Sequence, residues 1–464
     1  MTPSGAWLTS AVVLIGFTAS VLAQTQTPAP VRAIDAANTT VLSPDQARVA
    51  ARKLLAVGHA KAAQDVLEVL VSRDPDDAVS HTLLAHAHRM QGNHDAATFA
   101  ARTAWQKADQ DQVKYAAALA AAQSLAKDDK EMRAQIWLRR AAHVAPDDAR
   151  RARAIRDYRF VRDTSPWSTR FRFGITPSDN VNNAPRDNTY ILGGLVFVDE
   201  DAVPLSGVEI NAGADLRYNF NISQTQRDFV ELSWDQTRVV LTDDNVPEDV
   251  SASDFTYTKL ETTLGRDWQS SAEAPRRTAS LGYGRIWYGG EHLSDELSLS
   301  YRQRQARPGG SHLWWHAKVG YADRQDNDLR SGTTSAVGVG WRFPFEGGAQ
   351  LVLSADVSST DTDSSISDHE SLALSTSYTL SARPMGVLTT FTGQAKFRRY
   401  DTPVYGVDAR SDDEFTLSTS MLFTGFDTYG FAPKVTVSAN RTNSNVSLFE
   451  TQSVGVSIGF ESVF

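Results

Sequence analysis

The feature that most constrains this chain is an alternation of apolar and polar side chains that recurs through residues 163–464. Between Trp167 and Ile175 every second residue is apolar or Thr, and Arg170 and Arg172 stand between them. Because successive side chains of a β-strand point to opposite faces, each such segment predicts a strand with one apolar and one polar face. A soluble sandwich would repeat this pattern less often and with fewer charges opposite. An apolar outside around a polar inside is typical of a transmembrane β-barrel, which must close because lipid leaves no strand edge solvated.

The alternation predicts fourteen strands, an even number, in an antiparallel barrel. They are placed near 167–176, 205–221, 228–241, 253–268, 276–288, 293–305, 311–323, 332–343, 348–358, 370–380, 386–400, 413–423, 431–441 and 448–464. Long polar connections such as 358–370 and 400–412 follow odd strands, and short turns such as 382–384 follow even strands. Outer-membrane barrels have long outer loops and short periplasmic turns. The alternation of long and short connections predicts that the N-terminal domain and the C-terminus lie in the periplasm. The connection after the fifth predicted strand is an exception, because it is short although it lies on the side of the long loops.

The C-terminal segment predicts an assembly signal. Val456, Ile458 and Phe460 alternate with polar or small residues towards a terminal Phe464, with Ser462 where an aromatic is usual. This resembles the signal that the barrel assembly machinery reads, so we expect that machinery and outer-membrane lipid as partners.

The N-terminus predicts export. Residues 1–23 are apolar and end in a small-residue pattern typical of a cleaved signal peptide, so we expect a mature chain from Gln24. The leader has no Lys or Arg, and an uncleaved membrane anchor is the alternative. Residues 24–43 are polar and rich in Pro and Ala, which predicts a flexible linker. The chain contains no Cys, which excludes disulfides, thiol catalysis and a lipidated cysteine.

Residues 44–162 predict helical repeats. Gly58 recurs as Gly92 and Ala63 as Ala97, each 34 residues later. This is the tetratricopeptide period, in which helical hairpins stack into a concave interaction surface in the periplasm. An unrelated helical bundle is the alternative.

Charge is unevenly distributed along the chain. Residues 44–162 carry 20 Lys+Arg and 15 Asp+Glu, whereas 163–464 carry 25 and 39. The last predicted helix contributes Arg150, Arg151, Arg153 and Arg156. These four form either a solvated face or a docking face for the barrel mouth, anionic lipid headgroups or an acidic client. The overall net charge of -9 gives no indication of a nucleic-acid partner.

The residues with reactive side chains do not assemble into a predicted active site. Residues 455–459 formally match a nucleophile elbow but lie inside the last strand, where the required strand–turn–helix context is missing. His86 and His88 are two apart on a helix and point to different sides. His312 and His316 share a strand face with no evident carboxylate partner and are expected to line the lumen. We therefore expect no enzyme, no cofactor and no metal site.

Helical repeats before a barrel of this size resemble the surface lipoprotein assembly modifier (Slam) family. The resemblance covers roughly residues 45–464 and rests on two polar stretches, 178–185 after the first strand and 443–449 before the last. The residues of the first stretch that match the family are Asp179, Asn180, Asn182, Asn183 and Pro185.

The resemblance implies an outer-membrane translocator that delivers a specific client, a surface lipoprotein or a secreted binding protein, to the cell surface. Client folding outside or hand-off from a periplasmic chaperone would drive it. The lumen, the seam between the first and last strands and the repeat domain would be its working parts. An exopolysaccharide export porin with periplasmic repeats and a general uptake porin are the alternatives, although the first usually carries more repeats and the second needs none.

Overall fold

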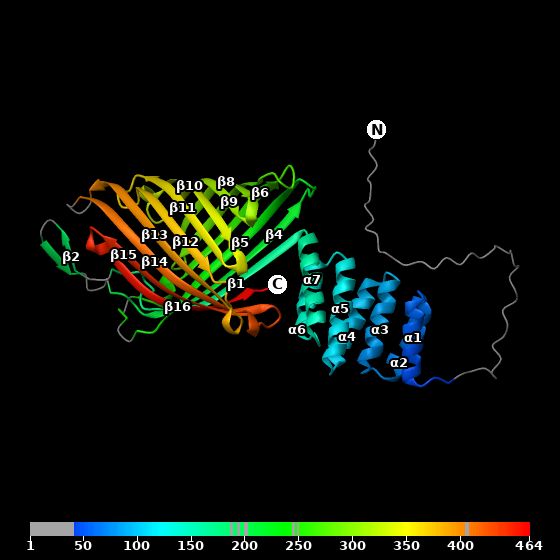
Figure 1. Cartoon of the computed structure of the whole chain (residues 1–464). Helices are drawn as coiled ribbons and strands as arrows, with labels where there is room; N and C mark the ends of the chain where they lie inside the picture. Colours follow the sequence, from blue (N-terminus) through cyan, green and yellow to red (C-terminus); the bar gives the residue numbers. More distant parts are fainter. Residues whose placement is uncertain are drawn as a thin grey trace.

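The computed structural model describes residues 41–185, 189–192, 195–198, 203–243, 246–247, 250–403 and 408–464. The predicted signal peptide and nearly all of the predicted linker lie outside these residues. The described chain begins with helices and continues into a barrel (Figure 1). The helices are α1 (Pro44–Ala56), α2 (Ala60–Arg73), α3 (Ala78–Met90), α4 (His94–Lys107), α5 (Asp111–Lys127), α6 (Glu131–His143) and α7 (Asp148–Thr164). None of the described helices is long and apolar enough to cross a membrane.

The helices form three hairpins followed by the single helix α7. The turns within the hairpins contain Gly58, Gly92 and Asp129, all at positive φ, a conformation that glycine adopts without strain. Five residues after each turn an alanine without exposed surface lets the paired helices approach closely: Ala63, Ala97 and Ala134. The repeat period read from the sequence therefore marks real structural equivalents, while the tetratricopeptide assignment itself stays a prediction.

The hydrophobic core of the described chain lies in these helices. It is rich in alanine, with larger side chains such as Leu67, Leu125 and Trp137 between the layers. The chain enters α1 through a capping box, as Ser43-Pro44-Asp45-Gln46 predicts. The Ser43 amide donates to Gln46 Oε1 at 2.9 Å, and the Gln46 amide donates to Ser43 Oγ at 3.3 Å.

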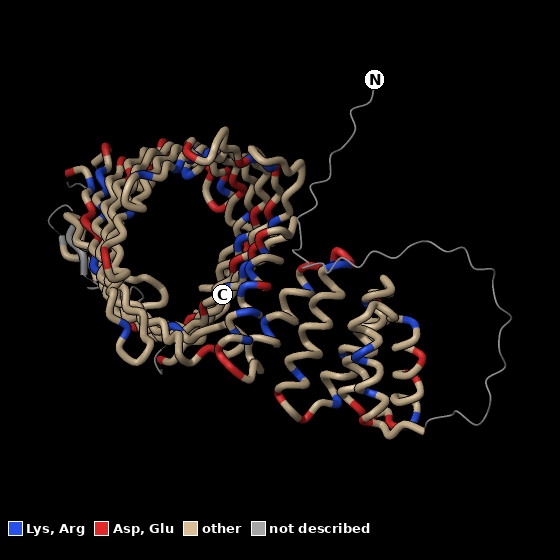
Figure 2. Tube along the Cα trace, turned by 45° about the vertical axis from the view of Figure 1, so that its right-hand side comes forward, with Lys and Arg blue, Asp and Glu red and all other residues tan. Residues whose placement is uncertain are grey.

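Fourteen antiparallel strands close into a barrel, which confirms the predicted fold class and strand number. Figure 2 shows them as a closed ring with the helices beside one rim. The strands are β1 (Trp167–Ser178), β4 (Gly207–Phe220), β5 (Gln226–Leu241), β6 (Tyr257–Trp268), β7 (Arg276–Tyr288), β8 (Glu291–Ala306), β9 (His312–Arg324), β10 (Gly332–Pro344), β11 (Gln350–Thr362), β12 (His369–Thr379), β13 (Val387–Pro403), β14 (Ala409–Phe423), β15 (Phe431–Ser444) and β16 (Thr451–Ser462).

A separate hairpin of β2 (Thr189–Leu192) and β3 (Leu195–Val198) lies in the connection from β1 to β4, where the alternation predicts no strand. The far end of the barrel is the end at which this hairpin is inserted, and the near end is the end at which the helices join.

Several predicted far-end loops are wrong in length. The loop placed at 358–370 is mostly strand, because β11 and β12 remain paired up to Thr360 and His369. β13 likewise extends to Pro403, into the loop placed at 400–412. These strand ends have polar residues on both faces, so the alternation that identified the strands fades while the backbone ladder continues. The short fifth connection is a two-residue turn, in which Gly289 and Gly290 both have positive φ.

The two faces of the barrel differ as predicted. Apolar side chains on one face are exposed, for example Leu299 at 57%, Val337 at 59% and Ile458 at 49%. The opposite face of each strand carries the charged and hydroxyl side chains, and exposed lumen-facing groups such as Arg304 and Lys318 occur among them. The core cluster does not extend into the barrel beyond Phe464, so among the described residues the inner face is polar and accessible to water.

Candidate functional site

The helices dock on the near end of the barrel through arginine side chains. Arg151 of α7 forms an ion pair with Asp427 in the turn before β15, at 2.6 Å. Arg139 of α6 donates to the Tyr429 carbonyl at 3.0 Å and to Ser462 Oγ at 2.8 Å. These contacts bring the last repeat helices to the point where the final strand ends.

Phe464 lies in this junction rather than in the outward-facing row. Its ring centroid is 5.6 Å from that of Tyr158 and 5.1 Å from the Arg139 guanidinium carbon. Arg162 donates to the Phe464 carbonyl at 3.0 Å. By contrast, the strand residues of the predicted assembly signal point outward and are 40 to 53% exposed: Val456, Ile458 and Phe460. The expected recognition of this segment during assembly remains a prediction, and the folded protein gives Phe464 a second environment.

The predicted basic face on α7 does not act as one unit. Arg151 reaches the barrel, whereas Arg150 pairs with Asp147 of its own helix turn at 2.7 Å. Arg153 and Arg156 are exposed to solvent. Arg139, which the sequence analysis missed because it lies on α6 outside the arginine-rich helix, makes more contacts with the barrel than any of the predicted four.

The seam that closes the barrel is unusual in how little of it is paired. β1 pairs with β4 over twelve positions but with β16 at only three: Gly174–Gly459, Ile175–Ile458 and Ser178–Gly455. The near-end half of β1, from Trp167 to Phe173, has no ladder partner in β16. Unpaired strand edges are costly in lipid, so this half of the seam is the weakest part of the wall. The docked helices lie at this same end.

The residues carried over from the family resemblance hold the far end of the seam. The Val454 amide of β16 donates to Asp179 Oδ1 at 3.1 Å. Asn180 is buried, and its side chain closes a turn by donating to the Ala184 carbonyl at 2.9 Å and accepting from the Ala184 amide at 2.8 Å. The Asp179 contact, together with donation from Asn180 Nδ2 to the Gln452 carbonyl at 3.5 Å, ties the connection after β1 to β16.

The other residues of this stretch organise the loop itself. The Asn182 side chain bridges to the returning chain, donating to the Val203 carbonyl and accepting from the Leu205 amide, both at 2.9 Å. Asn183 has a φ of 49°, a region that asparagine tolerates better than most residues. Pro185 ends this described segment. The stretch is thus positioned as structure at the seam, and a contact with a client stays a prediction.

Ion pairs cover one part of the inner wall. Arg172 of β1 pairs with Asp215 of β4 and, at 2.7 Å, with Asp235 of β5. Lys259 of β6 lies 2.9 Å from Glu296 of β8. The sequence shows these residues on the polar face of their strands, but only the register brings opposite charges together. Because the charges cancel locally, this part of the wall binds water and itself rather than attracting one sign of ion.

Hydroxyl groups are frequent on the inner wall from β11 to β15. Side-chain hydrogen bonds link neighbouring strands from β11 to β15, for example Ser358 with Ser371 at 2.8 Å and Ser420 with Thr436 at 2.8 Å. This part of the inner wall is rich in hydroxyl groups and also carries the ion pairs Arg398–Glu414 at 2.6 Å and Lys434–Glu461 at 3.0 Å.

The expectation that His316 lacks a carboxylate partner is wrong. Its Nε2 lies 3.0 Å from Asp356 Oδ1 across strand β10, where Gly338 leaves the room. The alternation of apolar and polar residues indicated which face of β9 carries His316. Its partner Asp356 lies two strands away, on β11, so that contact depends on the register between the strands. Among the described residues no group of three or more His, Cys, Asp or Glu side chains is placed to hold a metal ion.

The helical domain contains a groove lined by the first helices of two successive hairpins and by the single helix α7. It has a volume of about 360 Å³ and extends over α3, α5 and α7, with Leu83, Leu119 and Tyr115 as apolar lining and His86, Arg89 and Arg150 around it. Burial lowers the pKa of Arg89, and burial together with the charge of Arg89 lowers the pKa of His86. His86 is therefore neutral at neutral pH, which leaves Arg89 and the Asp147-paired Arg150 as the arginines of a groove that also contains Gln112 and Gln123.

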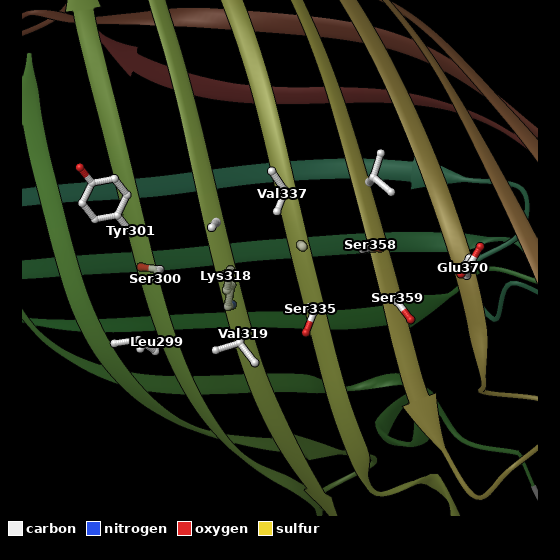
Figure 3. A pocket seen from close by; sticks show the side chains of 13 residues that line it. Leu299, Ser300, Tyr301, Lys318, Val319, Ser335, Val337, Ser358, Ser359 and Glu370 are labelled. Carbon is white, nitrogen blue, oxygen red and sulfur yellow. The ribbon is translucent and has the colours of Figure 1, made fainter.

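A second hollow lies on the wall of the barrel across β8 to β12. Figure 3 shows the side chains of Leu299, Val319 and Val337, which belong to the exposed apolar face, on neighbouring strands. Its lining fits the membrane-facing surface, and we assign no ligand to it.

No known protein family and no curated protein matches the sequence. Among solved structures, the chain resembles the outer membrane channel DcaP of Acinetobacter baumannii with a TM-score of 0.38 and 11% identity, covering 64% of this chain and 98% of that one. It also resembles a loop-deletion mutant of the outer membrane protein OmpT of Vibrio cholerae, with a TM-score of 0.35, 8% identity and coverage of 64% and 99%. Both matches concern the barrel fold and are too distant to assign a function.

Proposed function

We propose that this chain is an outer-membrane translocator that receives a specific client protein, a surface lipoprotein or a secreted binding protein, on its periplasmic helices and delivers it to the cell surface. The observation that carries the proposal is the position of the helical domain. It is docked by Arg139 and Arg151 at the near end of the barrel, beside the unpaired half of the β1–β16 seam. A client held on the helices would therefore lie next to both the lumen and the weakest part of the wall.

The groove and the charge distribution support this role. A groove with apolar lining and two arginines fits an extended or helical protein segment that carries acidic residues. The helices carry a net positive charge and the barrel a net negative one, so a client would be attracted to the helices first. The seam, with three ladder pairs and the Asp179 and Asn180 contacts, is the part of the wall that could open with the fewest broken hydrogen bonds.

A general channel is the second candidate, because the inner face is polar and water-accessible and the structural resemblances are to outer-membrane channels. This role makes no use of the groove or of the docked helices. Export of a polysaccharide is less well supported, because aromatic side chains that would stack on sugars are mostly on the outward face, as with Trp341 at 42% and Phe391 at 47% exposure.

A two-component display experiment tests the proposal. The chain is co-expressed with a candidate client taken from the neighbouring gene, and surface display is measured by protease shaving of intact cells. We expect Arg89→Glu in the groove to reduce display at unchanged barrel yield, while Arg102→Glu, an exposed residue of α4 outside the groove lining, leaves display unchanged. Equal display with no barrel present contradicts translocation. Unchanged display for both variants, together with passage of small sugars into proteoliposomes, favours the channel.

A further inference from the structure

Three arginines face the lumen close to the near end of the barrel. Arg302 and Arg304 lie in the last part of β8, and Arg342 lies in the last part of β10. Leu299 of β8 and Trp341 of β10 are exposed on the apolar outer face, and the three arginines stand at an odd number of residues from them on the same strands. Their side chains therefore point to the opposite, inner face. The strand between them is β9, so the three guanidinium groups belong to one patch of the inner wall.

These arginines have no partner in the described structure. Within the described part of the chain, Arg302, Arg304 and Arg342 form no ion pair and no side-chain hydrogen bond, whereas Arg172 has two acidic partners. The Nε atom of Arg342 is buried and unsatisfied. Arg302 and Arg304 are exposed to the lumen. Three unpaired cations close together give this patch a net positive potential.

An aromatic ring occupies the middle of the patch. Trp314 of β9 lies opposite Arg304 on one side and Gly340 on the other in the strand register. A β-carbon added to Gly340 would collide with the Trp314 ring, so the ring lies across β10 at this glycine, two residues from Arg342. The ring shields one side of the patch from water, which strengthens electrostatic interactions there.

We propose that this patch is an anion-binding site and that its ligand is an acidic, extended segment of the exported polypeptide. Guanidinium groups bind carboxylates through paired hydrogen bonds. Arg302 and Arg304 are two residues apart on one strand, which places them about 7 Å apart along it. Acidic side chains at alternate positions of an extended polypeptide have the same spacing, so one segment can engage both arginines, with Arg342 across β9 holding a further carboxylate.

The preference of the site for carboxylates follows from the arginine patch alone. The inference that these carboxylates belong to an exported polypeptide rests on the proposed function. A small organic acid has the same chemistry but cannot span the arginines of β8 and β10 together. The position of the site at the near end means that a client leaving the helices would meet it early in passage.

Current block of the full-length protein in planar lipid bilayers tests the site. Hexaglutamate, glutarate and hexalysine are added separately on both sides, and the concentration that halves the current is measured. The test variant is Arg304→Gln with Arg342→Gln. The control is Arg307→Gln with Arg383→Gln, which removes the same charge from exposed turns at the same end. We expect hexaglutamate to block the parent and the control at about tenfold lower concentration than the test variant, and hexalysine to show no such difference.

Equal block of the test and control variants by hexaglutamate overturns the site. Block by glutarate as strong as block by hexaglutamate overturns the polypeptide ligand and leaves a small organic acid. If the barrel passes no current, binding of hexaglutamate to the detergent-solubilised protein is measured by calorimetric titration. The same test and control variants are then compared by their affinity for hexaglutamate. Neither measurement needs a client. If hexaglutamate still distinguishes the test variant from the control while client display fails, translocation alone is contradicted. If hexaglutamate no longer distinguishes them while display is intact, the site alone is contradicted.

Discussion

Replacing Phe464 by alanine should release the helical domain from the barrel without unfolding either one. The ring of Phe464 is mostly buried between Tyr158 and the Arg139 guanidinium group. Burial of most of a phenylalanine ring contributes about 1.5 kcal/mol, and the aromatic and cation–π contacts together add about 1 kcal/mol. A loss of about 2.5 kcal/mol lowers the ratio of docked to undocked molecules about sixtyfold, since each 1.4 kcal/mol is tenfold.

The assay measures a distance between the two domains. Because the chain has no native Cys, spin labels at Arg133→Cys on α6 and Arg383→Cys in a near-end turn report only this distance by pulsed electron resonance. We expect a narrow distribution in the parent and a broad one in Phe464→Ala. Phe160→Ala is the matched control, because that ring on α7 is 69% exposed and lies outside the junction. An equally narrow distribution in Phe464→Ala refutes the view that this ring holds the domains together.

Two further predictions concern stability and topology. Asp77→Ala should destabilise the helices by about 1 to 2 kcal/mol, measured by thermal unfolding of the helical circular dichroism signal, because Asp77 caps α3 through the Ser80 amide at 3.0 Å and pairs with Arg48 at 2.6 Å. Burial opposes ionisation of Asp77, but the hydrogen bonds from Ser80 and Arg48 outweigh it and lower its pKa. The contribution of Asp77 to the stability of the helices is therefore present above about pH 4 and is lost as the pH falls below that value. A destabilisation by Asp77→Ala that persists unchanged at pH 2 contradicts this reasoning. An epitope in 363–368 should be accessible on intact cells and one in 381–384 should not, and equal accessibility of both contradicts the predicted orientation.

The sequence by itself determined the class of fold and the number of strands. Two-residue alternation is a local property of each strand, so residues such as Leu299 and Ile458 identify their outward face without any knowledge of their neighbours. The helical period was equally readable, because Gly58 and Gly92 are required locally by the turn conformation. Strand ends were misplaced where both faces are polar, since the local signal disappears there.

Only the tertiary structure decided which residues work together. Strand register pairs His316 with Asp356 and Arg172 with Asp215, and register depends on the pairing of whole strands rather than on any single segment. The docking of Phe464 against Tyr158 joins residues that are far apart in the chain, and the sparse pairing of β1 with β16 becomes visible only when the barrel closes. A sequence specifies such contacts through the sum of many weak packing and hydrogen-bonding terms, and no short motif records that sum.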